Sequence, residues 1–98
     1  MNKIVVNKCY GGFSLSEKAA RLLCKKLGVR YTKEFCHNIP VPRHSKYLVE
    51  VVEELGAEAN GPYTDLKVEE TYSNIYRIVK DSGYESIETP DSLHWIVI

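Results

Sequence analysis

A pair of adjacent glycines, Gly11-Gly12, separates an apolar run from an amphipathic segment, and this junction most constrains the fold. The preceding run Ile4-Val5-Val6 is β-branched and short, which is typical of an interior strand over residues 3–8. The following Ser14-Leu15-Ser16-Glu17 matches a capping box, with Ser14 as N-cap and Glu17 three residues later. Gly28 suits the end of such a helix. The pattern predicts a strand, a tight glycine turn and a helix over about 15–27.

The remaining chain changes from helical to alternating periodicity. The basic stretch 29–43 contains two prolines and is interpreted as a loop. A second helix is expected from Ser45 to Gly56. Strand or turn patterns then occur at 66–68, 74–80, 81–83, 84–88 and 93–98, the last being either a strand or a docked tail. The expected fold is α+β: β-α-α followed by an antiparallel β-meander, with both helices packed on one face of a small sheet.

Length and composition limit the class of protein. A chain of 98 residues predicts one domain over 1–98. It has no apolar run near the roughly 20 residues of a membrane span, and its start does not resemble a secretion signal. A cytoplasmic protein with no membrane association is therefore expected. The odd number of cysteines, Cys9, Cys24 and Cys36, favours reduced thiols, and the absence of a C-x-x-C pair predicts no metal site.

The zero net charge hides a strong asymmetry. Residues 1–46 contain ten Lys/Arg and two Asp/Glu, a net of +8, whereas residues 47–98 contain three and eleven, a net of −8. Such a division indicates a basic ligand surface, or attraction between halves or between subunits. It is equally compatible with complementary faces that pack together within one monomer.

The glycine turn is the sharpest candidate site. Backbone N–H groups after a tight turn, next to a helix N-terminus, favour an anion. Gly11, Gly12, Phe13 and Ser14 would supply amides, and Ser14 and Ser16 hydroxyls. Lys8 would add charge, and Tyr10 or Phe13 would stack on a base. The spacing matches no established phosphate-binding motif, so a plain turn that packs its aromatic residues in the core is the competing interpretation.

The start of the second helix is another candidate. Arg43 and His44 stand where cations are unfavourable for the helix dipole, which suggests a compensating contact such as a phosphate. The alternative is a solvated basic helix start. The Cys36-His37 pair is interpreted as an ordinary loop cysteine and an exposed histidine, because no partner acid stands at a telling spacing.

The run 7–16, NKCYGGFSLS, resembles the opening of a family of short phage and prophage proteins with an NKCYGGF-S/G-LS signature. Further matching blocks are 48–56, 59–61 and 66–68, with a weaker block at 76–87. The chain departs from the family pattern at 72–74 and at its C-terminus. The resemblance implies a phage-encoded accessory protein. By analogy of size and origin, such a protein would counter host defence by binding a nucleotide immune signal.

The sequence therefore predicts a non-enzymatic, cytoplasmic binding protein that holds a small anionic, nucleotide-like ligand and has no cofactor. A chain this small encloses a ligand most economically between subunits, so a homodimer or larger homo-oligomer is expected. The alternative is a protein–protein interaction module that inhibits a host protein through its charged faces and tyrosines. Nucleic-acid binding by the basic half ranks third and catalysis last.

Overall fold

The computed structural model describes residues 2–90. Its elements follow one another in the order β-α-α-β-β-β, with two short 3-10 helices, η1 and η2, between them. The bounds are β1 Asn2–Asn7, α1 Glu17–Leu27, η1 Lys33–Cys36, α2 Lys46–Leu55, η2 Gly56–Ala59, β2 Leu66–Thr71, β3 Arg77–Asp81 and β4 Tyr84–Glu88. The expected strand or tail over 93–98 lies outside the described residues.

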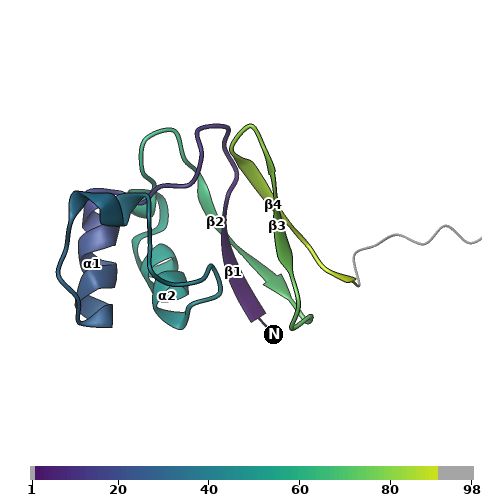
Figure 1. Cartoon of the computed structure of the whole chain (residues 1–98), viewed down its shortest axis with the longest axis horizontal. Coiled ribbons are helices and arrows are strands. Elements are labelled where there is room, and N and C mark those ends of the chain that lie inside the picture. Colours follow the sequence, from purple (N-terminus) through teal and green to yellow (C-terminus); the bar gives the residue numbers. More distant parts are fainter. Residues whose placement is uncertain (1, 91–98) are drawn as a thin grey trace, which may run out of the picture.

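The helices lie on one side of the strands (Figure 1), and α2 contacts β1 and β2 while α1 contacts α2. The strands form two antiparallel pairs, β1 with β2 and β3 with β4. The α+β class is thus confirmed. The pairing is more specific than a simple meander, because β2 returns to β1 and leaves β3 and β4 as a hairpin of their own.

Strand β1 is buried on both faces, as its β-branched run predicts. Ile4, Val5 and Val6 are all fully buried. Val5 pairs with Val68 and joins the core beneath the helices. Because successive residues of a strand point to opposite faces, Ile4 and Val6 face the other side.

The helix signals are confirmed in position, with one correction. Gly28 ends α1 in the left-handed conformation at φ 70°, and Ser45 and Gly56 flank α2. The N-cap of α1, however, is Ser16 and not Ser14, because the Ser16 hydroxyl accepts the Ala19 N–H. Ser14 is instead buried in an extended segment that precedes the helix. The capping-box interpretation is therefore wrong, although Glu17 does lie in the first turn.

The β3–β4 hairpin has the predicted turn. Ser82 and Gly83 both have positive φ, 52° and 92°, as a two-residue turn with the twist of a hairpin requires. The strand predicted over 74–80 begins later, at Arg77, and the 29–43 loop contains the short helix η1. Among residues 2–90 no helix is both long enough and apolar enough to cross a membrane.

Candidate functional site

The glycine loop is held between two other turns. A side chain at Gly11 would clash with the backbone and Cβ of Tyr63, and one at Gly83 would clash with the backbone of Tyr10 and Gly12. The Lys8 N–H also donates to the Asp65 carbonyl at 2.8 Å. Gly11 and Gly83 therefore have a packing role, because only a residue without a Cβ permits this approach of backbones.

The glycine loop does not lead directly into α1, because an extended segment lies between them. Between them, Leu15 forms a bridge with Asn60 and donates its N–H to the Cys36 carbonyl at 2.8 Å. The Ser16 N–H donates to the Ala59 carbonyl at 2.9 Å, and the Ser16 hydroxyl donates to the Glu58 carbonyl at 2.6 Å. Of the donors expected to meet an anion, the Ser16 hydroxyl thus has protein partners. The amides of Leu15, Ser16 and Ala19, which follow the loop, are also bonded within the protein.

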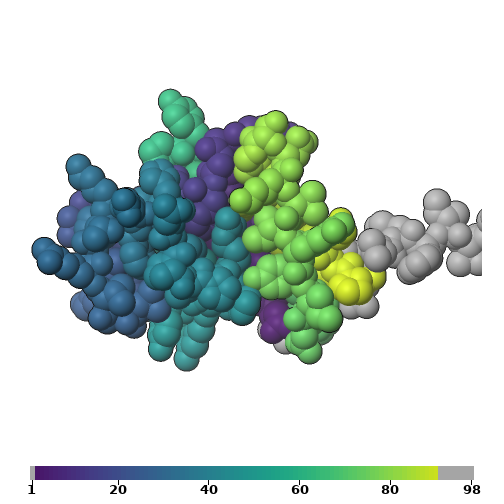
Figure 2. Space-filling model, viewed as in Figure 1, coloured from purple at the N-terminus to yellow at the C-terminus, as the bar shows by residue number. Residues whose placement is uncertain are grey.

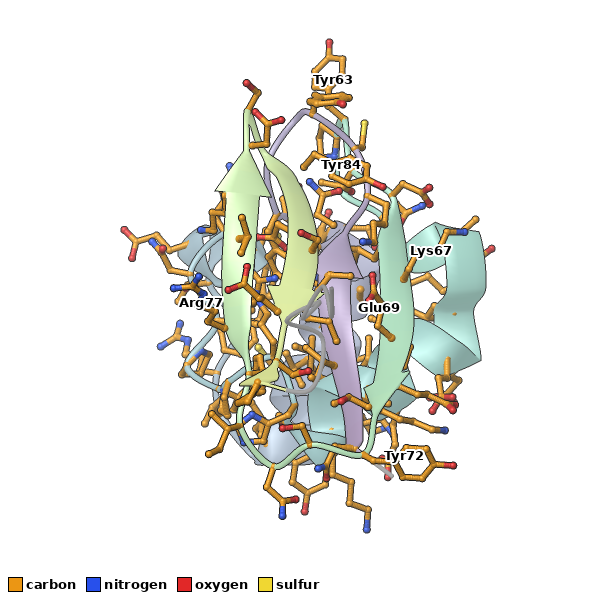
Figure 3. All side chains as sticks on the ribbon, turned by 90° about the vertical axis from the view of Figure 1, so that its right-hand side faces the viewer. Tyr63, Lys67, Glu69, Tyr72, Arg77 and Tyr84 are labelled. Carbon is orange, nitrogen blue, oxygen red and sulfur yellow. The ribbon has the colours of Figure 1, made fainter. Side chains whose placement is uncertain are left out.

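The predicted side chains separate into three groups. Lys8 and Tyr10 both lie against Tyr84: the Lys8 ammonium is 5.2 Å from the Tyr84 ring centre, and the Tyr10 and Tyr84 ring centres are 5.4 Å apart. Lys8 also pairs with Glu69 at 2.5 Å. Figure 3 shows Tyr84 and Glu69 on the face of the strands that is turned away from the helices.

Arg43 and Phe13 form the second group. The Arg43 guanidinium lies 3.7 Å from the Phe13 ring centre and donates to both carboxylate oxygens of Glu85, at 2.5 and 2.9 Å. Glu85 is only 1% exposed and accepts the Asn7 N–H as well. A buried carboxylate needs such a partner, so the charge of Arg43 is balanced inside the protein.

His44 lies apart from both groups. Its Nδ1 is 2.8 Å from the Tyr76 hydroxyl, beside a cavity of about 150 Å³ that Asn2 and Lys3 also line. Burial raises the pKa of Tyr76 above its ordinary value, while the nearby Arg43 charge partly opposes this shift. The structure therefore does not bring His44 together with the glycine loop.

A cavity of about 460 Å³ lies between the 37–43 loop and the β3–β4 hairpin. In Figure 2 the green hairpin lies next to the teal segment that leads into α2. No acidic residue of the 2–90 range lines this cavity. The lining residues are Phe13, His37, Asn38, Ile39, Val41, Pro42, Arg43 and Lys80.

Two of these, Phe13 and Arg43, were predicted from the sequence, whereas His37, Asn38 and Lys80 were not. His37 is indeed exposed, as expected. The basic composition of residues 29–43 was the sequence feature that could have indicated His37 and Asn38 as site residues. Lys80 could not be placed there from sequence, because its position depends on how the hairpin docks.

Five of the ten cations in residues 1–46 form ion pairs with acids of the second half. Each pair joins a cation before residue 47 to an acid after it: Lys3–Glu53, Lys8–Glu69, Lys18–Glu58, Lys26–Glu50, Lys26–Glu54 and Arg43–Glu85. Lys80 has no ion pair within residues 2–90, so its ammonium is available to a ligand in the cavity.

The three cysteines are free thiols in different surroundings. Cys24 is buried, and burial raises the pKa of its thiol above the ordinary value. The Cys36 sulfur lies 3.8 Å from the Tyr31 hydroxyl, and this contact raises the pKa of Tyr31. Residues 2–90 contain no group of three or more His, Cys, Asp or Glu side chains arranged to hold a metal ion.

Comparisons with protein-family models, with curated proteins and with solved structures gave no significant match.

Proposed function

We propose that this protein binds a small anionic, nucleotide-like ligand without catalysis, in the cavity between the 37–43 loop and Lys80. The observation that carries the proposal is the lining of that cavity. It combines the Phe13 ring, the Lys80 ammonium and apolar loop residues, and no carboxylate of the 2–90 range faces it. Its volume falls in the range of small-molecule sites.

The proposed site shifts the binding role away from the glycine loop. Phe13 and Arg43 keep a place in it, and His37, Asn38 and Lys80 replace Lys8, Tyr10 and His44 as polar partners. The resemblance of residues 7–16 to phage proteins supports a more specific role, the sequestration of a nucleotide immune signal in the cytoplasm of a host cell. A homo-oligomer that closes the cavity with a second copy remains part of this proposal.

A thermal-shift panel at fixed ionic strength tests the proposal. It compares mononucleotides, cyclic dinucleotides and cyclic ADP-ribose isomers with sulfate. A ligand at about 100 times its Kd adds about 2.7 kcal/mol to the free energy of unfolding, which raises the Tm of a domain this size by several degrees. We expect at least one nucleotide to produce this shift while sulfate does not. A flat panel would contradict the proposal.

The exposed tyrosines favour a second candidate, a protein–protein interaction module. Tyr10, Tyr63 and Tyr72 are 67%, 83% and 83% exposed, and Figure 3 shows Tyr63 and Tyr72 at opposite ends of the strand face. Tyrosine is enriched at interfaces. This candidate predicts a host protein that binds the wild type but not a Tyr10→Ser/Tyr63→Ser variant, together with a flat nucleotide panel.

A further inference from the structure

Resting on the proposed function, we propose that Lys80 binds the anionic group of the ligand and that Arg43 is a positioning residue that orients Phe13. Both side chains line the same cavity. The surroundings of Lys80 and Arg43 differ, and from this difference we infer different roles for the two side chains. The assignment reverses the expectation from sequence, in which Arg43 neutralises the ligand.

Arg43 is already committed to the protein. One of its terminal nitrogens donates to the Val5 carbonyl at 3.3 Å and to Glu85 at 2.5 Å, and the other donates to Glu85 at 2.9 Å. Its side chain is 15% exposed and that of Glu85 is 1% exposed. Turning the guanidinium toward a ligand would leave a buried carboxylate without its counter-charge, which is strongly unfavourable.

The guanidinium instead fixes the Phe13 ring. It lies over the ring at 3.7 Å from its centre, a distance that gives a favourable cation–π contact. Because Arg43 is held by Glu85 and by β1, the ring it covers is held too. The orientation of the aromatic wall of the cavity therefore depends on Arg43, although the charge of Arg43 is not available to the ligand.

Lys80 has the opposite character. It is exposed on β3, next to the hairpin turn, and it has no ion pair within residues 2–90. An ammonium on a flexible stem offers three donors that can follow an anion. A phosphate held by Lys80 would bridge the hairpin and the 37–43 loop.

Calorimetric titration of purified protein with 5′-AMP and with adenosine separates these roles. AMP carries the phosphate that Lys80 would bind, and adenosine lacks it. We expect Lys80→Gln to weaken AMP binding at least tenfold and to leave adenosine binding unchanged. Lys67→Gln, an exposed lysine on β2 that does not line the cavity, is the matched control and should bind both as wild type does.

Arg43→Lys should weaken AMP and adenosine by the same factor, because it disturbs Phe13 and not the phosphate contact. If Arg43 had a purely structural role, Arg43→Lys would lower the Tm but would leave both affinities unchanged when they are measured well below the Tm. If wild type binds AMP and Lys80→Gln binds it equally well, the assignment of Lys80 is wrong while the proposed function stands. If wild type binds neither compound, this inference fails. The proposed function fails as well only if the thermal-shift panel of nucleotides is flat.

Discussion

At the scale of single residues, Glu85 joins segments that are distant in the chain. Its carboxylate accepts hydrogen bonds from the Arg43 guanidinium and from the Asn7 N–H. Asn7 adds side-chain bonds to the carbonyls of Cys9 and Gly83. Three segments, β1, the loop before α2 and the hairpin, therefore meet at one buried charge. Such a cluster stabilises the fold only while both partners are present.

Replacing Glu85 with Gln should lower the free energy of unfolding by about 3 kcal/mol, because the partly buried Arg43 loses its counter-charge. Chemical denaturation followed by circular dichroism measures this change. Glu58→Gln is the control: Glu58 pairs with Lys18 in solvent, and exposed pairs contribute little. Equal denaturation midpoints for Glu85→Gln and wild type would contradict the central role of this cluster.

At the scale of elements, the two helices begin differently. Ser16 caps α1 with its hydroxyl, which accepts the Ala19 N–H at 3.1 Å. Ser45 precedes α2 in the same sequence role but makes no side-chain capping bond. The two serines therefore form a matched pair, in which only Ser16 has hydroxyl bonds to lose: the capping bond and the bond to the Glu58 carbonyl.

Ser16→Ala should cost about 1 kcal/mol of stability, the usual loss when an N-cap hydroxyl is removed. Ser45→Ala should cost less than about 0.5 kcal/mol, because no capping bond is lost. Thermal unfolding of both variants provides the comparison. A larger loss for Ser45→Ala than for Ser16→Ala would show that the caps are wrongly assigned.

Local patterns predicted the elements well and their contacts poorly. The strand at 4–6, the glycine that ends α1 and the Ser82-Gly83 turn follow from backbone preferences that act over a few residues. The capping-box prediction failed because two serines stand two residues apart, and tertiary contacts hold the segment of the first one extended. The Ser14 carbonyl accepts the Gly61 N–H, and the Leu15 and Ser16 N–H groups donate to the Cys36 and Ala59 carbonyls. The cavity residue Lys80 was missed because hairpin docking depends on contacts between segments more than 35 residues apart in sequence.

At the scale of the whole molecule, ion pairs connect the basic first half of the chain to the acidic second half. Most of the pairs that join them lie at the surface, where salt screens them. We expect Tm to fall as NaCl is raised from about 0.05 M to about 1 M, where the Debye length is about 3 Å. Scanning calorimetry measures the trend, and KCl should reproduce it. An unchanged or rising Tm would show that these pairs contribute nothing to stability.

The junction between β1 and the hairpin consists of side chains and not of a strand ladder. The Arg43 carbonyl accepts the Val5 N–H, and the Arg43 guanidinium donates to the Val5 carbonyl. The Glu85 carboxylate accepts the Asn7 N–H. The edge of β1 is thus covered by groups that belong to other segments. The attachment of the hairpin therefore depends on a few positions, the Glu85 carboxylate, the Gly83 turn and the Tyr84 ring. The other hairpin positions, Lys80 in the cavity wall among them, can change in sequence without disturbing the core.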